Sequence, residues 1–162
     1  MNFDLERFLE AQDRGDFQRA LRELEAGRKT GHWIWYILPQ LRELGRSSTA
    51  IRYGLDGVEE AEAYLSHPVL RQRLVEIVSV AHDQVRQHSP PLTVLMGSGI
   101  DARKLVSCLT LFEAVARALD QREPTPELAR LATQAHEILE AAEAQGYARC
   151  PVTLQRLARR AG

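Results

Sequence analysis

Apolar residues recur at every third or fourth position along most of this chain, and no other feature constrains its fold as strongly. The pattern is clearest in four segments, Phe17–Leu24, Leu70–Val85, Leu105–Leu119 and Leu128–Leu139. This period places the apolar side chains on one face of an α-helix. The strict alternation of a half-buried strand is nearly absent, so we predict an all-α protein.

Residues that begin or end helices separate these segments. We expect helices to begin at Asp4, Asp16, Ser47, Asp56, Ser66–His67–Pro68, Gly97–Ser98–Gly99 and Thr125. The run Leu92–Met96 is too short to show a period and is compatible with an extended segment. The unequal segments favour roughly six to eight short and medium helices in irregular orthogonal packing over a simple four-helix bundle. No repeat or long linker divides the sequence, so we expect residues 1–162 to form a single domain.

The composition argues against several classes of protein. The 162 residues carry a formal net charge of −1, which argues against a nucleic-acid partner. No apolar run approaches the roughly 20 residues of a membrane-spanning helix, and the acidic start of the chain does not resemble a signal peptide. Cys108 and Cys150 lack a CxxC spacing, so we expect two reduced thiols, the first in the core, and a cytoplasmic location. His82, His88 and His136 have no carboxylate or cysteine at ligand spacing, so we expect neither a metal nor a cofactor.

The segment Gly31–Leu41 is unusual because it contains both tryptophans of the chain and has no polar face. The wider stretch from Arg28 to Tyr53 holds five basic residues and one acidic residue, a net charge of +4. One interpretation is that the segment belongs to the core and that Gln40 or His32 binds the indole N–H groups. The other is that the tryptophans form one wall of a pocket for a planar ligand, with arginines at its anionic end.

A second unusual feature lies at the start of the helix that follows the glycine–serine–glycine turn. Asp101 and Lys104 share the apolar face of Leu105–Leu119, whereas Ser107 and Thr110 point elsewhere. Charge on an inward face must be paired or hydrated. Asp101 is then either a cap or first-turn acid, with Lys104 reaching the solvent, or both residues line a cleft at the polar end of the core. The turn is suited to holding an anion, although no Walker or dinucleotide fingerprint is present.

In these segments the chain resembles DUF1810, a family of unknown function. The resemblance covers nearly the whole chain and rests on Phe8–Gln12, Gly27–Lys29, His32–Leu41, Leu44–Ser47, Arg52–Gly54, Tyr64–Leu70 and Asp101–Phe112. Its most specific element is the combination of His-Trp-x-Trp with Pro-Gln-Leu. The resemblance implies a mainly α-helical single domain, and it implies no activity because the family is uncharacterised.

We hypothesise that the domain binds a small anionic, nucleotide-like ligand in a cleft where the two unusual segments meet. If the protein is an enzyme, this ligand is also its substrate. We expect Asp101 to pair there with Arg52 or Lys104. The candidates for ligand binding are Trp33, Trp35, Gln40, Arg46, Arg52, Tyr53, His67 and Lys104, and the candidates for acid–base catalysis are His32 and Asp101. The sequence does not decide whether the protein is an enzyme, nor its oligomeric state.

The alternative hypothesis is a protein-interaction module without catalysis. The aromatic segment would then be half-exposed and would act as an apolar anchor for a partner. His67, which precedes Pro68, also has a second interpretation, as the cap of the helix that follows it. A concave cleft lined by polar groups favours the ligand hypothesis, and a flat apolar patch favours the interaction module.

Overall fold

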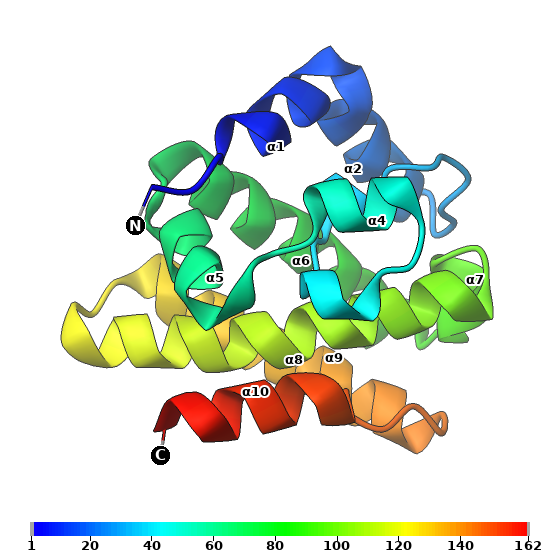
Figure 1. Ribbon diagram of the computed structural model, residues 1–162. Coiled ribbons are helices and arrows are strands. Elements are labelled where there is room, and N and C mark those ends of the chain that lie inside the picture. The colour runs from blue at the N-terminus through cyan, green and yellow to red at the C-terminus, as the bar shows by residue number, and fades with distance from the viewer. Residues whose placement is uncertain (1, 162) are drawn as a thin grey trace.

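The regular structure of the protein is helical, which confirms the predicted all-α class. The computed structural model describes residues 2–161 (Figure 1), and within this range the one β-type pairing is an isolated bridge between Leu41 and Leu55. No helix in this range is long and apolar enough to cross a membrane. The elements in chain order are α1 (Glu6–Ala11), η1 (Gln12–Asp16), α2 (Phe17–Glu25), α3 (Ile34–Ile37), η2 (Arg42–Leu44), α4 (Ser48–Tyr53), α5 (Gly57–Ser66), α6 (Pro68–His88), α7 (Leu92–Leu95), α8 (Gly99–Arg122), α9 (Pro126–Ala144) and α10 (Pro151–Ala161).

The described part of the chain has ten α-helical segments, more than the roughly six to eight expected for this pattern. The difference arises because α3 and α7 are single turns of four residues. The sequence was compatible with an extended segment at Leu92–Met96, but the structure has the helical turn α7 there. Leu92 and Leu95 of this turn are fully buried. A run this short spans little more than one helical turn, so its period does not distinguish a helix from a strand.

The helix starts lie near the predicted positions, but the caps differ in kind. Side chains accept hydrogen bonds from first-turn N–H groups at Ser47, His67, Ser98 and Thr125. The predicted caps that form no such bond are Asp4, Asp16 and Asp56. At Asp16 the chain has just passed a kink at Arg14 and Gly15, where the φ of Gly15 is +91°. The Asp16 carboxylate accepts a hydrogen bond from the Tyr36 hydroxyl instead of capping α2.

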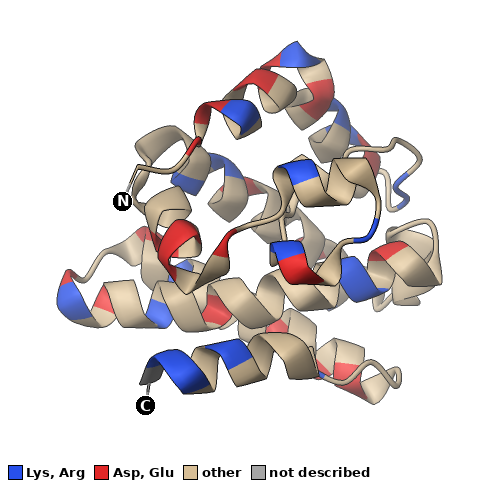
Figure 2. Cartoon of the chain, viewed as in Figure 1, with Lys and Arg blue, Asp and Glu red and all other residues tan. Residues whose placement is uncertain are grey.

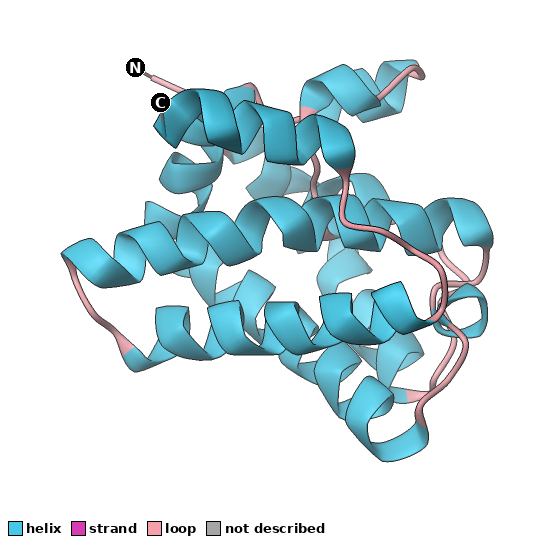
Figure 3. Ribbon diagram, turned by 90° about the horizontal axis from the view of Figure 1, so that it is seen from below, coloured by secondary structure: helices cyan, strands magenta, loops and turns pink. Residues whose placement is uncertain are grey.

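α8 is the centre of the fold. It lies between α9 and α10 (Figure 3), and α5 and α7 also pack against it. Five consecutive residues in its middle, Cys108–Phe112, are all buried. An amphipathic helix on a surface buries one stripe only, so this run shows that the middle of α8 is covered on every side. α6 packs against both α9 and α2 and connects this central part to the N-terminal helices.

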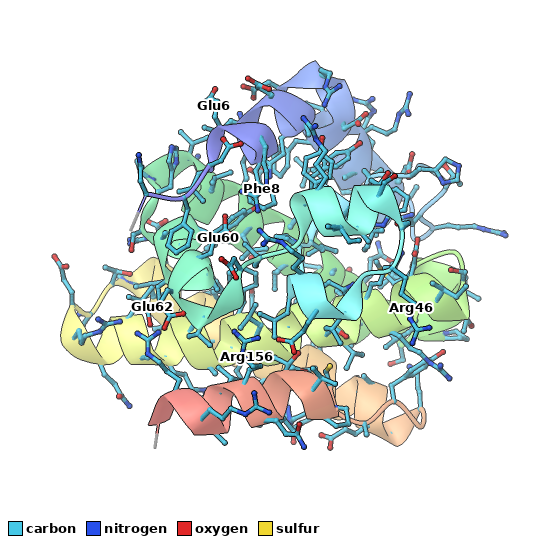
Figure 4. All side chains as sticks on the ribbon, viewed as in Figure 1. Glu6, Phe8, Arg46, Glu60, Glu62 and Arg156 are labelled. Carbon is cyan, nitrogen blue, oxygen red and sulfur yellow. The ribbon has the colours of Figure 1, made fainter. Side chains whose placement is uncertain are left out.

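α10 is joined to α5 and η2 by ion pairs. Arg160 lies 2.7 Å from Glu59 and 2.6 Å from Glu62, and Arg156 pairs with Glu43. Figure 2 shows the basic residues on α10 and the acidic residues on α5, and Figure 4 labels Glu62 and Arg156. Exposed pairs of this kind contribute about 0–1 kcal/mol each. The packing of α10 on α8 is therefore needed to hold it in place.

A buried ion pair joins α1 to α5. Arg7 Nη1 lies 2.8 Å from Glu60 Oε2, and the two side chains are 9% and 2% exposed. Arg7 also donates hydrogen bonds to the carbonyls of Arg52 and Gly54. The second oxygen of Glu60 accepts from the backbone N–H of Asp56. The pair therefore fixes the turn between α4 and α5 against α1; Figure 4 labels Glu60 on α5.

Neutralising Glu60 should destabilise the protein strongly, because Arg7 would remain as an uncompensated buried charge. We expect Glu60→Gln to lower the free energy of unfolding by about 3–5 kcal/mol. The neighbouring Glu59→Gln removes an exposed partner of Arg160, and we expect it to cost less than about 1 kcal/mol. Urea denaturation of the two variants measures the difference, and equal losses would contradict the role of Glu60.

Both cysteines are free thiols. Cys108 is fully buried, as predicted, and burial raises the pKa of its thiol above the ordinary value. Cys150 is 8% exposed, and its backbone N–H donates to Thr110 Oγ1, so this segment is attached to α8 more closely than expected.

A thiol reagent added to the native protein should modify Cys150 slowly and Cys108 only after unfolding, since the thiolate is the reactive form and Cys108 is inaccessible. Mass spectrometry of peptides taken during the reaction separates the two sites. Modification of Cys108 at the same rate as Cys150 would show that α8 is exposed along the face assigned here to the core.

Candidate functional site

A cleft of about 310 Å³ lies between the loop that follows α2 and the junction of α7 with α8. Figure 1 shows these two backbone segments on the same side of the molecule. We call it the α8 cleft. It contains residues of both unusual segments of the sequence, which are distant in the chain. The residues that line it are Lys29, Thr30, Gly31, His32, Trp35, Met96, Gly97, Ser98, Ile100 and Asp101.

Both lysines of the chain bind the same carboxylate beside this cleft. Lys29 Nζ lies 2.6 Å from Asp101 Oδ2, and Lys104 Nζ lies 3.7 Å from Asp101 Oδ1. The side chains of Lys29, Asp101 and Lys104 are 5%, 17% and 22% exposed. The sequence has 19 arginines and only these 2 lysines. The predicted pairing of Asp101 with Lys104 is therefore present, but the shorter contact is to Lys29, and Arg52 does not take part.

The backbone also joins the two sides of the cleft. The N–H of Lys29 donates to the carbonyl of Leu95 at 2.8 Å. Gly97 has a φ of +82°, and a Cβ atom at this position would lie 2.5 Å from the carbonyl oxygen of Lys29. Glycine is needed here for both its conformation and its small size. The loop and the start of α8 are thus fixed against each other without help from a ligand.

Glu23 of α2 holds the other end of the loop. Its Oε1 accepts hydrogen bonds from the backbone N–H groups of Thr30 and Gly31, each at 2.8 Å, and from the Trp33 indole at 2.9 Å. Burial of this carboxylate opposes its ionisation, but the three hydrogen bonds outweigh burial and lower its pKa from 4.5 to about 2. An anionic Glu23 therefore shapes the loop that carries Lys29 and His32.

The two tryptophans have different roles. Trp33 is 1% exposed and lies with its ring 5.0 Å from Lys29 Nζ, so it belongs to the core rather than to an exposed pocket wall. Trp35 is half-buried, lines the α8 cleft, and has Lys104 Nζ 4.8 Å from its ring centre. Each lysine of the chain therefore lies over one tryptophan and beside Asp101.

Of the predicted binding residues, Trp35 alone is among those that line the cleft. Lys104 lies beside the cleft, over the Trp35 ring, and the others lie elsewhere. Tyr53 is buried against Phe8 and Tyr36. His67 Nδ1 accepts from the N–H groups of Val69 and Leu70 and caps α6, which is its second interpretation. These two side chains are thus occupied within the fold. The remaining three residues are Gln40, Arg46 and Arg52. Gln40 is half-buried in the segment after α3, and the two arginines are exposed.

The two candidates for acid–base chemistry differ in availability. Both carboxylate oxygens of Asp101 face ammonium groups, so Asp101 is occupied in positioning the two lysines. His32 is exposed at the rim of the cleft. It also lines a second hollow of about 550 Å³ on the other side of the loop, which contains Glu23 and Asp16.

Sequence reasoning missed two residues that build the site, Lys29 and Glu23. It used Lys29 only in a net charge and in the family motif Gly27–Lys29, and it did not single out Glu23. The scarcity of lysine in an arginine-rich chain was a usable signal, since an ammonium group and a guanidinium group are not interchangeable. No comparable signal marked Glu23, because its partners are mainly backbone N–H groups of a loop.

The low pKa of Glu23 predicts a pH-dependent contribution to stability. A carboxylate whose pKa is lowered on folding stabilises the protein above its ordinary pKa of 4.5, and this contribution is lost as the pH falls toward about 2. We expect Glu23→Gln to lower the free energy of unfolding at pH 7 by about 1–3 kcal/mol, and the difference from wild type to shrink below pH 4.5. Urea denaturation between pH 7 and pH 3 measures it, with the exposed Glu25→Gln as control. A difference that does not change with pH would contradict this assignment.

Comparisons with known proteins agree with the resemblance seen in the sequence. No curated protein matches this chain. Among solved structures, the conserved hypothetical protein Rv1873 from Mycobacterium tuberculosis is 35% identical, with a TM-score of 0.67 over 89% of this chain and 97% of that chain. The family model DUF1810, described as a protein of unknown function, matches residues 2–125, which include every residue of the α8 cleft. The match spans more than half of the sequence, and the chain therefore belongs to the DUF1810 family.

Proposed function

We propose that the protein binds a small anionic ligand in the α8 cleft. The observation that carries this proposal is the position of both lysines of an arginine-rich chain on one carboxylate at the cleft. An ion pair that only stabilised the fold would need one cation, and arginine is the usual choice for a buried pair. A second lysine at the same carboxylate leaves one positive charge for a ligand.

The electrostatics of the cleft favour an anion. Asp101 is the one acidic residue among the described residues that line it, and it faces two ammonium groups. The N-terminus of α8, a helix of 24 residues capped by Ser98, lies at the same place. The partial positive charge of a helix N-terminus adds to that of the lysines. We assign Lys104 to the anionic group because Lys29 is 5% exposed and already bound to Asp101 and Gly31.

The shape of the cleft favours a ligand with a planar part. Trp35 offers a half-buried aromatic wall, and Met96 adds an apolar surface. The volume of about 310 Å³ lies at the lower end of the roughly 300–1,000 Å³ range of small-molecule sites. A nucleotide-like compound combines a planar base with an anionic group, and we propose this class. If the ligand is also processed, His32 at the rim is the candidate acid or base.

One observation favours the second function, a protein-interaction module. Ile100 lines the cleft and is 70% exposed, the most exposed of the large apolar side chains described. An exposed isoleucine at the edge of an aromatic cleft is suited to contact an apolar partner. In that case the partner would be recognised by its apolar surface, and small anions would not bind.

Titration with 5′-AMP and with inorganic phosphate tests the proposal. We expect 5′-AMP to quench the fluorescence of Trp35 and to raise the melting temperature by mass action, and we expect both effects to weaken with added salt. Trp35→Phe should abolish the quenching, because the remaining tryptophan is buried. Phosphate alone should bind more weakly, since it lacks the planar part.

Lys104→Met is the decisive variant, because it removes the second positive charge at Asp101 and leaves the pair of Lys29 with Asp101 intact. We expect the affinity for 5′-AMP to fall at least tenfold, which corresponds to about 1.4 kcal/mol. The control is Arg159→Met, which removes one exposed positive charge from α10. Equal losses in both variants would indicate nonspecific attraction, and the absence of binding by either anion would favour the interaction module.

A further inference from the structure

A second cavity, of about 370 Å³, lies between α8, the loop that follows α9 and the start of α10. We call it the α10 cavity. It shares no lining residue with the α8 cleft and does not depend on the proposed function. One wall is a face of α8 formed by Arg103, Val106 and Ser107, at spacings of three and four residues. The opposite wall includes Tyr147 and Cys150.

Hydrogen bonds hold the walls of this cavity in place. Thr110 Oγ1 donates to the carbonyl of Val106 at 2.7 Å and accepts from the backbone N–H of Cys150 at 3.2 Å. The N–H of Tyr147 donates to the carbonyl of Ala142 at 2.9 Å. The loop is thus attached to α8 on one side and to α9 on the other. Ser107 and Thr110, which point away from the predicted apolar stripe of α8, both serve this cavity.

The polar side chains that line the cavity are available for a ligand. Arg103, Ser107 and Tyr147 make no side-chain hydrogen bond or ion pair with other residues in the range 2–161. Within this range, Arg103 and Asp120 are the charged residues of α8 without an ionic partner. The other charged residues of α8 are all paired. No acidic residue is among the described residues that line the cavity, and Pro151 places the N-terminus of α10 at its edge. All of these features favour a negatively charged group.

The cavity also has an apolar lining, which Val106, Ala148 and Pro151 form together with the ring of Tyr147. We propose that the α10 cavity binds a small carboxylic acid with an apolar or aromatic body. The guanidinium group of Arg103 binds the carboxylate, and the hydroxyl of Ser107, one turn further along α8, donates a further hydrogen bond. The body of the ligand packs between the ring of Tyr147 and Pro151.

Cys150 provides a reporter at the cavity, because this residue lines it and Cys108 is fully buried. The test measures the rate at which the uncharged reagent methyl methanethiosulfonate modifies Cys150, followed by peptide mass, with benzoate or benzyl alcohol added. The two probes have similar shapes and differ in charge. We expect benzoate to slow the reaction and to raise the melting temperature at concentrations at which benzyl alcohol does neither.

Arg103→Gln tests the residue that selects the charge. We expect it to raise the benzoate concentration needed for half-protection at least tenfold, whereas Arg22→Gln, an exposed arginine of α2, should leave this concentration unchanged. Equal protection by benzyl alcohol, unchanged protection in Arg103→Gln, or no effect of benzoate on either the rate or the melting temperature would each overturn the proposal. Binding of 5′-AMP to the α8 cleft is measured separately, so the two proposals fail or succeed independently.

Discussion

The burial of the middle of α8 on every side is the constraint on which the rest of the structure depends. The middle is enclosed by α5, α9 and α10, and the one polar side chain within Cys108–Phe112, that of Thr110, is hydrogen-bonded to the backbone of Val106 and Cys150. At the N-terminal end the first turn carries Asp101, which is 17% exposed and requires a partner. The loop after α2 supplies that partner as Lys29, and the position of the loop then fixes where a cleft forms. The position of the cleft thus follows from the need to pair the charged first turn of α8, where this helix emerges from the core.

Much of the fold follows from local pattern alone. The stripes in α2, α6, α8 and α9 and the caps at Ser47, His67 and Thr125 agree with the structure, because both depend on neighbours within one or two turns. The pattern fails where tertiary contacts decide. Leu92–Leu95 forms a turn of helix because it is buried against α8, and Cys108–Phe112 is buried all round because three other helices cover it. Neither result depends on the period of the sequence.

The site was predictable only in part, and for a physical reason. Asp101 attracted attention because an inward charge is costly, and that argument is local. Its main partner, Lys29, lies 72 positions away, and nothing in the spacing of either residue specifies the other. The same limit applies to Tyr53 and His67, since an aromatic side chain that packs internally and a histidine that caps a helix have the same local sequence as binding residues. Glu23 was missed because backbone N–H groups leave no trace in a sequence.

The scarcity of lysine also means that amine-specific chemical modification is confined to few side chains of the protein. Reagents that acylate amines do not react with guanidinium groups, so the 19 arginines are silent to them. Lys29 is 5% exposed and bound to two oxygens, whereas Lys104 is 22% exposed and lies over Trp35. Of the two lysine side chains, Lys104, beside the α8 cleft, is therefore the one expected to be acylated in the folded protein. The reactivity of this amine in the unmodified, purified protein therefore reports on its surroundings beside the α8 cleft.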